Sequence, residues 1–152
     1  MVKKSNEEFI IQKAIIDYLD KNGYWWERAN SGQAFVKNGY STRKIMLMRR
    51  GCPDLLSCVD GQLVGIEVKK SEKEYKRWKT IIDKYREIVG DNPDLKMQWR
   101  HEILTYPEIK KSWEREIFQY KYAIRMTRGG GKYILTYSVE HLEEQLNKLK
   151  LK

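Results

Sequence analysis

One tight hairpin constrains the fold of this chain more than any other feature. The dipeptide Asp60-Gly61, a preferred loop of type I′ hairpins, separates two β-prone runs at 53–59 and 62–69. If these two residues form the loop, the strands pair so that Asp54 lies opposite Glu67. That register points one set of aliphatic side chains away from the carboxylates and into a core: Leu55, Val59, Val64, Ile66 and Val68. A slip of one residue would bury the carboxylates instead, so the pattern predicts this register.

The two facing carboxylates need a physical explanation, because like charges directly opposite on a sheet are destabilising. Lys69 lies two residues beyond Glu67 and on the same face of the strand. A divalent cation between Asp54 and Glu67 is the simplest explanation, and two carboxylates with a lysine suit metal-assisted hydrolysis of a phosphodiester. The alternative is an ordinary surface hairpin with incidental charges. The agreement of turn, pairing and apolar back face favours the metal site.

Composition narrows the class of protein. The 152 residues fit one domain with a real core, and a hydrophobic content of 41% excludes a disordered chain despite 34% charged residues. The net charge of +9 favours a polyanionic partner, with nucleic acid ahead of an acidic membrane surface. The chain shows no apolar run of spanning length and no signal peptide, so we expect a soluble, intracellular protein without a membrane partner. Cys52 and Cys58 are expected to be reduced packing residues, with a zinc site as the alternative.

Hydrophobic periodicity predicts the remaining elements. Helices are expected over 6–21 and 71–90, from Pro107 or Ser112 to about Arg125, and from Ser138 as cap to Leu149. Strands are expected over 24–30 and 132–137, whereas 95–106 is ambiguous. In the first strand, one of two adjacent tryptophans should be core and the other exposed. The stripe predicted to be apolar in the first helix is Phe9, Ile10, Ala14, Ile15, Tyr18 and Leu19. The apolar stripe predicted for the second helix is Trp78, Ile81, Ile82, Tyr85 and Ile88.

A basic stretch runs directly into Asp54. Residues 34–53 contain no acidic side chain but carry five cations: Lys37, Arg43, Lys44, Arg49 and Arg50. A run of charge usually marks a solvated face. Its position beside the carboxylates favours a role in holding backbone phosphates of DNA. No motif for reading bases is visible, so recognition of DNA structure rather than sequence is expected.

Four motifs together resemble a known family: Glu8, Asn30-Ser31-Gly32, Gly51-x-Pro-Asp54 and Ile66-Glu67-Val-Lys69. They are similar to the PD-(D/E)xK nuclease superfamily, and within it to the virus-type replication and repair nuclease (VRR-Nuc) branch. The resemblance implies an α/β fold with a restriction-endonuclease-like core, in which helices flank a mixed central β-sheet. It also implies a Mg²⁺- or Mn²⁺-dependent DNA endonuclease, selective for branched or flapped DNA, in the cytoplasm of a bacterium or a bacterial host.

The same resemblance assigns roles to individual residues. Asp54, Glu67, the carbonyl of Val68 and Glu8 would hold the metal, and Lys69 would orient the attacking water and stabilise charge in the transition state. The first helix of the family bears a Glu and, four residues on, a Gln, which correspond to Glu8 and Gln12. The closing Ser-x-x-Gln helix would start at Ser112, with auxiliary roles for two positions: Arg115, which stands where the family has Gln, and Gln119, one turn further.

About forty residues, roughly 70–111, separate the Glu-x-Lys strand from that helix, where the family has almost none. We therefore expect a single nuclease domain over 1–152 with an inserted helical segment. The apolar face of the insertion should pack on the chain's own core, with a homodimer contact as the alternative. A catalytically decayed nucleic-acid-binding module on the same fold fits the charge equally well. A further alternative is a viral interaction protein on this fold that uses the insertion to bind a host partner.

Overall fold

A computed structural model describes the backbone at residues 6–29, 33–39, 41–46 and 48–150, and the side chains at 7–29, 39 and 48–150. The fold is α/β, with five α-helices in the described residues around a four-stranded mixed sheet of order β1-β4-β5-β6. Its strands are β1 (Trp25–Arg28), β4 (Leu55–Val59), β5 (Gln62–Val68) and β6 (Lys132–Thr136). The first three pair antiparallel, and β6 joins β5 in parallel.

The β4–β5 hairpin has the predicted register. Leu55 pairs with Ile66, and Val59 pairs with Gln62 across the turn. Asp60 and Gly61 both adopt positive φ, at 50° and 79°, as a type I′ turn requires. All five aliphatic side chains that the pattern assigned to the core are buried in it. The hairpin prediction is therefore confirmed, except that β4 begins one residue after Asp54.

Two helices cover the aliphatic face of the sheet. The first, α1 (Asn6–Lys21), and the last, α5 (Val139–Lys150), pack against each other and enclose the main core. The apolar stripe predicted for α1 is partly wrong, because Phe9, Ile10 and Ala14 are exposed. The buried face is rotated so that Gln12 and Ile16 join Ile15 inside. Of the two adjacent tryptophans in β1, Trp25 is exposed and Trp26 packs on the core, as expected.

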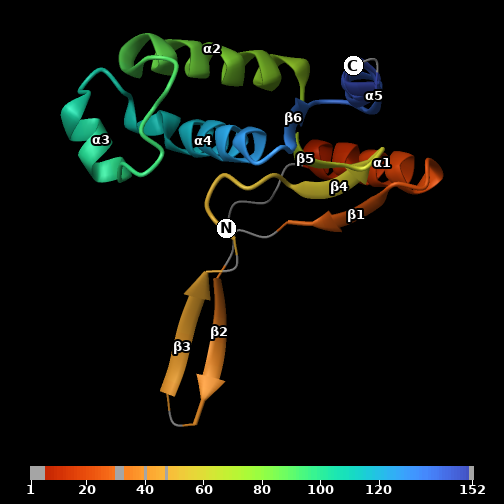
Figure 1. The fold of residues 1–152 in the computed structure, drawn as a ribbon, viewed down its shortest axis with the longest axis horizontal. Coiled ribbons are helices and arrows are strands. Elements are labelled where there is room, and N and C mark those ends of the chain that lie inside the picture. The colour runs from red at the N-terminus through yellow and green to blue at the C-terminus, as the bar shows by residue number, and fades with distance from the viewer. Residues whose placement is uncertain (1–5, 30–32, 40, 47, 151–152) are drawn as a thin grey trace.

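The opposite face of the sheet carries the other three helices: α2 (Glu72–Val89), α3 (Trp99–Thr105) and α4 (Glu114–Arg128). A short 3₁₀ turn, Lys111–Trp113, leads into α4. Figure 1 shows α2, α3 and α4 gathered on one side of the sheet. They share a second apolar cluster: Ile81, Ile82, Tyr85, Ile109, Trp113 and Ile117. The apolar face of the insertion thus packs within the chain itself.

A second, two-stranded sheet consists of β2 (Gln33–Asn38) and β3 (Ser41–Met46), paired antiparallel. Figure 1 shows this ribbon projecting away from the four-stranded sheet. It occupies most of the basic stretch and was not predicted. The signal that could have found it is Asn38-Gly39, since Gly39 has a φ of 64°. In the described part of the chain, no helix combines the length and apolarity needed to cross a membrane.

Candidate active site

Asp54 is held at the entrance to β4 by backbone contacts on both sides. Its Oδ2 accepts a hydrogen bond from the amide of Val68 at 2.8 Å, and its carbonyl accepts one from the amide of Ala29 at 3.0 Å. The side chain therefore reaches across to β5 beside Glu67. This is the juxtaposition that the hairpin register predicts, achieved by a residue that lies just outside the ladder.

Glu67 points to the face of the sheet that α4 covers, because strand residues alternate between faces and its neighbours Ile66 and Val68 belong to the core on the other face. The side chain is only 3% exposed. Its Oε1 accepts a hydrogen bond from Nε2 of Gln119 at 3.1 Å, while its buried Oε2 has no hydrogen-bond partner among the described residues. Burial raises the pKa of Glu67 well above its usual range, and the neighbouring charge of Asp54 raises it further.

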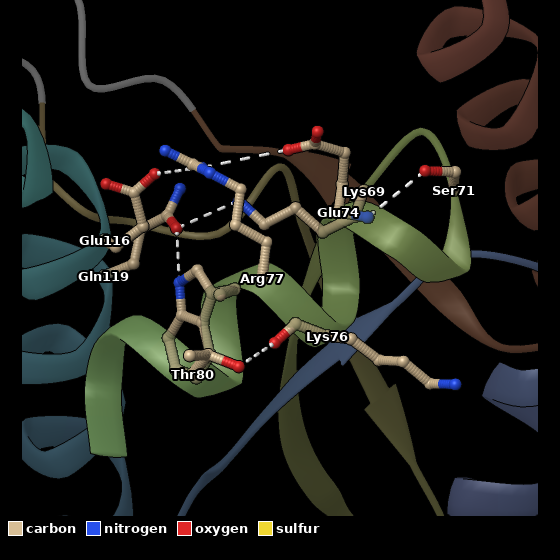
Figure 2. Close-up of polar contacts among 9 residues, drawn as sticks. Lys69, Ser71, Glu74, Lys76, Arg77, Thr80, Glu116 and Gln119 are labelled. Atoms are coloured by element: carbon tan, nitrogen blue, oxygen red, sulfur yellow. Dashed lines mark hydrogen bonds and ion pairs between the residues drawn. The ribbon is translucent and has the colours of Figure 1, made fainter. Parts of the chain in front are cut away.

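Lys69 extends from the end of β5 into the same site. Figure 2 shows its side chain running to Gln119, and Nζ donates to Oε1 of that amide at 3.1 Å. Burial lowers the pKa of Lys69, and the charge of Arg115 lowers it too, whereas Glu67 acts in the opposite direction. The side chain is 9% exposed, so lysine and carboxylate share a poorly solvated space.

Gln119 of α4 connects the groups of the site. Its Oε1 accepts from Lys69 and also from Nε1 of Trp78 at 2.9 Å. Both of these groups can only donate, so they fix the amide with its oxygen toward them and its Nε2 toward Glu67. Sequence reasoning placed Trp78 on an apolar face of the insertion and missed this contact. The indole N–H, which is the one polar atom of that side chain, was the available signal.

The Gly-x-Pro-Asp motif closes the site against α4. Gly51 has a φ of +88°, and a Cβ there would lie 2.2 Å from the carbonyl oxygen of Phe118. Glycine therefore permits a backbone-to-backbone approach that no other residue allows. Arg50 secures the same loop, since it pairs with Glu114 at 2.7 Å and its guanidinium lies 4.3 Å from the ring centroid of Phe118.

These elements enclose a cavity of about 360 Å³ that contains the candidate site. Asp54 and Glu67 line it from the hairpin, and Arg115 and Gln119 line it from α4. Arg115 is exposed, and its charge opposes the rise in the pKa of Glu67. The structure thus brings together the predicted pair, the lysine and both auxiliary positions.

Other predicted residues lie elsewhere or outside the described parts. Glu8 is half-buried in the first turn of α1, and Gln12, one turn on, is buried and accepts from Arg28. In the ranges that the structure describes, no three His, Cys, Asp or Glu side chains form a group that could hold a metal ion, so Glu8 does not complete such a group. The motif at residues 30–32 lies outside the described residues, as do the side chains predicted to bind DNA from β2 and β3: Lys37, Arg43 and Lys44. Cys52 and Cys58 are free thiols.

The donor set fits a divalent cation. A buried carboxylate oxygen without a partner is costly, and a second carboxylate beside it adds repulsion. A cation of the Mg²⁺ or Mn²⁺ type removes both penalties, and hard carboxylate oxygens are the ligands it prefers. Asp54 and Glu67 are the residues that would hold it.

Comparison of the chain with family models, with curated proteins and with solved structures gave no match in any of the three. The geometry of the cavity therefore carries the functional argument.

Proposed function

We propose that this protein is a metal-dependent DNA endonuclease with a restriction-endonuclease-like core, of the virus-type replication and repair branch of PD-(D/E)xK nucleases. The observation that carries the proposal is the buried Oε2 of Glu67, which has no hydrogen-bond partner among the described residues, next to the carboxylate of Asp54 and two residues from Lys69. A buried carboxylate beside a second one costs free energy without a compensating partner, and a bound cation would remove that cost.

Each group of the site has a distinct part in hydrolysis. Asp54 and Glu67 hold the cation, with the carbonyl of Val68 as a further ligand. When bound, a Mg²⁺ or Mn²⁺ ion supplies Lewis-acid activation of water and phosphate. Lys69 orients the attacking water and stabilises negative charge on the phosphorus centre. An ammonium has three N–H donors, and the bond to Gln119 uses one of them.

The α4 side of the cavity completes the electrostatics. Gln119 holds Glu67 and Lys69 at a fixed separation by bonding both. The exposed guanidinium of Arg115, at the cavity wall, is placed to contact a phosphate oxygen of the substrate. Branched or flapped DNA inside a bacterial cell is the substrate we propose, because the resemblance to the virus-type branch implies it and the sequence shows no motif for reading bases.

Cleavage of plasmid and branched DNA in Mg²⁺, in Mn²⁺ and in EDTA tests the proposal. We expect cleavage with either metal and none in EDTA. Asp54→Asn and Glu67→Gln should abolish it, whereas Asp17→Asn and Glu143→Gln, the same changes at exposed helical carboxylates, should not. Lys69→Gln should lower kcat at least about 100-fold with little change in DNA affinity.

Metal binding can be measured without activity. Mg²⁺ or Mn²⁺ should raise the Tm of the wild-type protein by mass action and leave that of Glu67→Gln unchanged. Near wild-type cleavage by folded Glu67→Gln would overturn the site assignment. DNA binding without cleavage under any metal would instead identify a binding module on this fold.

A further inference from the structure

A second hollow begins at Arg49, next to the loop that lines the carboxylate cavity. Its volume is about 690 Å³, and three segments line it: the loop at Arg49, the turn at residues 93–96 and the last turns of α4. Four of its side chains are cationic: Arg49, Lys96, Arg125 and Arg128. The single carboxylate in its lining, Asp94, accepts a hydrogen bond from the amide of Lys96 within its own turn.

The cations of this hollow repel one another. The charge of Arg49 lowers the pKa of Arg125, after the larger effect of burial. Across the described residues, none of the four forms an ion pair with a carboxylate, whereas Arg50, the neighbour of Arg49 in the chain, does. Arg125 instead donates to the carbonyl of Leu95 at 2.6 Å, which ties α4 to the turn of the insertion. The fold therefore gathers like charges and leaves them for an external anion.

The position of the hollow indicates which anion. Arg49 lines it, and the next residue, Arg50, lines the carboxylate cavity. Consecutive Cα atoms are about 3.8 Å apart, and a nucleic-acid strand carries one charge per roughly 3.4 Å of helix axis. A strand with a phosphate in the cavity therefore reaches the hollow within a few nucleotides. The lining has no aromatic side chain on which a base could stack.

We infer that Arg49, Lys96, Arg125 and Arg128 form a phosphate-binding groove that holds the sugar-phosphate backbone of DNA as it leaves the carboxylate cavity. The inference rests on the proposed function, because the path of the DNA strand is traced from a phosphate in the carboxylate cavity. It assigns the insertion a role in substrate binding, because Lys96 belongs to it. It also gives two adjacent arginines different roles: Arg49 contacts DNA, and Arg50 anchors the loop.

The test measures DNA affinity in EDTA by fluorescence anisotropy at a series of NaCl concentrations. The groove variant is Arg49→Gln/Lys96→Gln/Arg128→Gln, which keeps Arg125 and its bond to Leu95. The matched control is Lys13→Gln/Lys21→Gln/Lys148→Gln, on α1 and α5 at the opposite face of the sheet. Each variant removes three positive charges from a net charge of +9.

We expect the slope of log affinity against log salt to flatten by about 2–3 in the groove variant and to change by less than about 1 in the control. An unchanged slope in the groove variant, or an equal change in both variants, would overturn the groove.

A cleavage assay in Mg²⁺ distinguishes the two proposals. If the wild type does not cut yet the groove variant loses its slope, the nuclease fails and the groove stands. If the wild type cuts and the groove variant keeps its slope and KM, the groove fails and the nuclease stands.

Discussion

At the scale of single residues, Gly51 has the tightest surroundings of the glycines that the structure describes. It combines positive φ with direct contact to the backbone of α4, so Gly51→Ala introduces both strain and a clash that no side-chain movement relieves. Gly90 has nearly the same φ, +90°, but nothing lies within 4 Å of its would-be Cβ. Gly90→Ala should therefore cost about 1–3 kcal/mol of unfolding free energy from backbone strain, since its ψ of 177° with positive φ suits only glycine, and Gly51→Ala about 1–3 kcal/mol more from the added clash. Urea unfolding of both variants decides it, and equal losses would show that the close approach to Phe118 does not matter.

Trp78 contributes to the site through one atom. Trp78→Phe keeps the apolar packing but removes the N–H that, together with Lys69, orients the amide of Gln119. If the protein is a nuclease, kcat should fall about 10-fold or more while KM and Tm change little, as is typical of residues that orient a metal ligand. Trp99→Phe, in the same apolar cluster, is the control. A loss of stability without a change in kcat would make Trp78 a packing residue only.

At the scale of elements, a buried polar network joins the three helices on the site face. Lys121 of α4 pairs with Glu102 of α3 at 2.7 Å, and the hydroxyl of Tyr85 on α2 donates to the same carboxylate at 2.7 Å. Lys121→Met leaves an uncompensated buried charge and should cost about 3–5 kcal/mol. Lys121→Met/Glu102→Gln should recover much of that loss. A double variant as unstable as the single one, in chemical denaturation, would refute this account.

His141, at the junction of β6 with α5, should make the unfolding free energy depend on pH. His141 stacks on Tyr137 at 4.4 Å between centroids, and burial lowers its pKa below the usual value of 6.5. The unfolded chain therefore binds a proton more readily than the folded one. The stabilisation is fully present above about pH 6.5 and is lost as the pH falls through that value toward the folded pKa. Between pH 7.5 and 5.5, the wild type should lose more unfolding free energy than His141→Gln, and parallel curves would contradict this.

At the scale of the whole molecule, the insertion has its apolar face covered by α3 and α4. The alternative of a homodimer required this apolar face to be free for contact with a second copy of the chain. We therefore predict that light scattering on the free protein gives the mass of one chain, 18.2 kDa. A dimer mass would direct attention to Phe9, Ile10 and Trp25, which are large apolar side chains exposed on α1 and β1.

The sequence was informative where the determinants are local and silent where they are not. Asp60-Gly61 and the alternation around it specify the hairpin, and Ser71 and Ser138 cap the helices that they were expected to begin. The contact of Glu67 with Gln119 joins residues 52 positions apart, and only the α4-to-sheet packing creates it. The contact of Trp78 with Gln119 was missed for a similar reason, because its single N–H donor does not stand out in an otherwise apolar stripe. The rotation of α1 that exposes Phe9 depends on tertiary packing that helical periodicity does not determine.

The parallel pairing of β5 with β6 also sets the order in which the site can form during folding. The β4–β5 hairpin needs only its tight turn, whereas β6 can join β5 only across the whole of α2, α3 and α4. Contacts close in sequence form early and distant ones late. We therefore expect Asp54 and Glu67 to come together first in the hairpin, while still hydrated, and to lose water when α4 brings Gln119 against them. During synthesis the chain therefore carries both carboxylates from residue 67 onward, and the amide that completes the site follows 52 residues later, at Gln119.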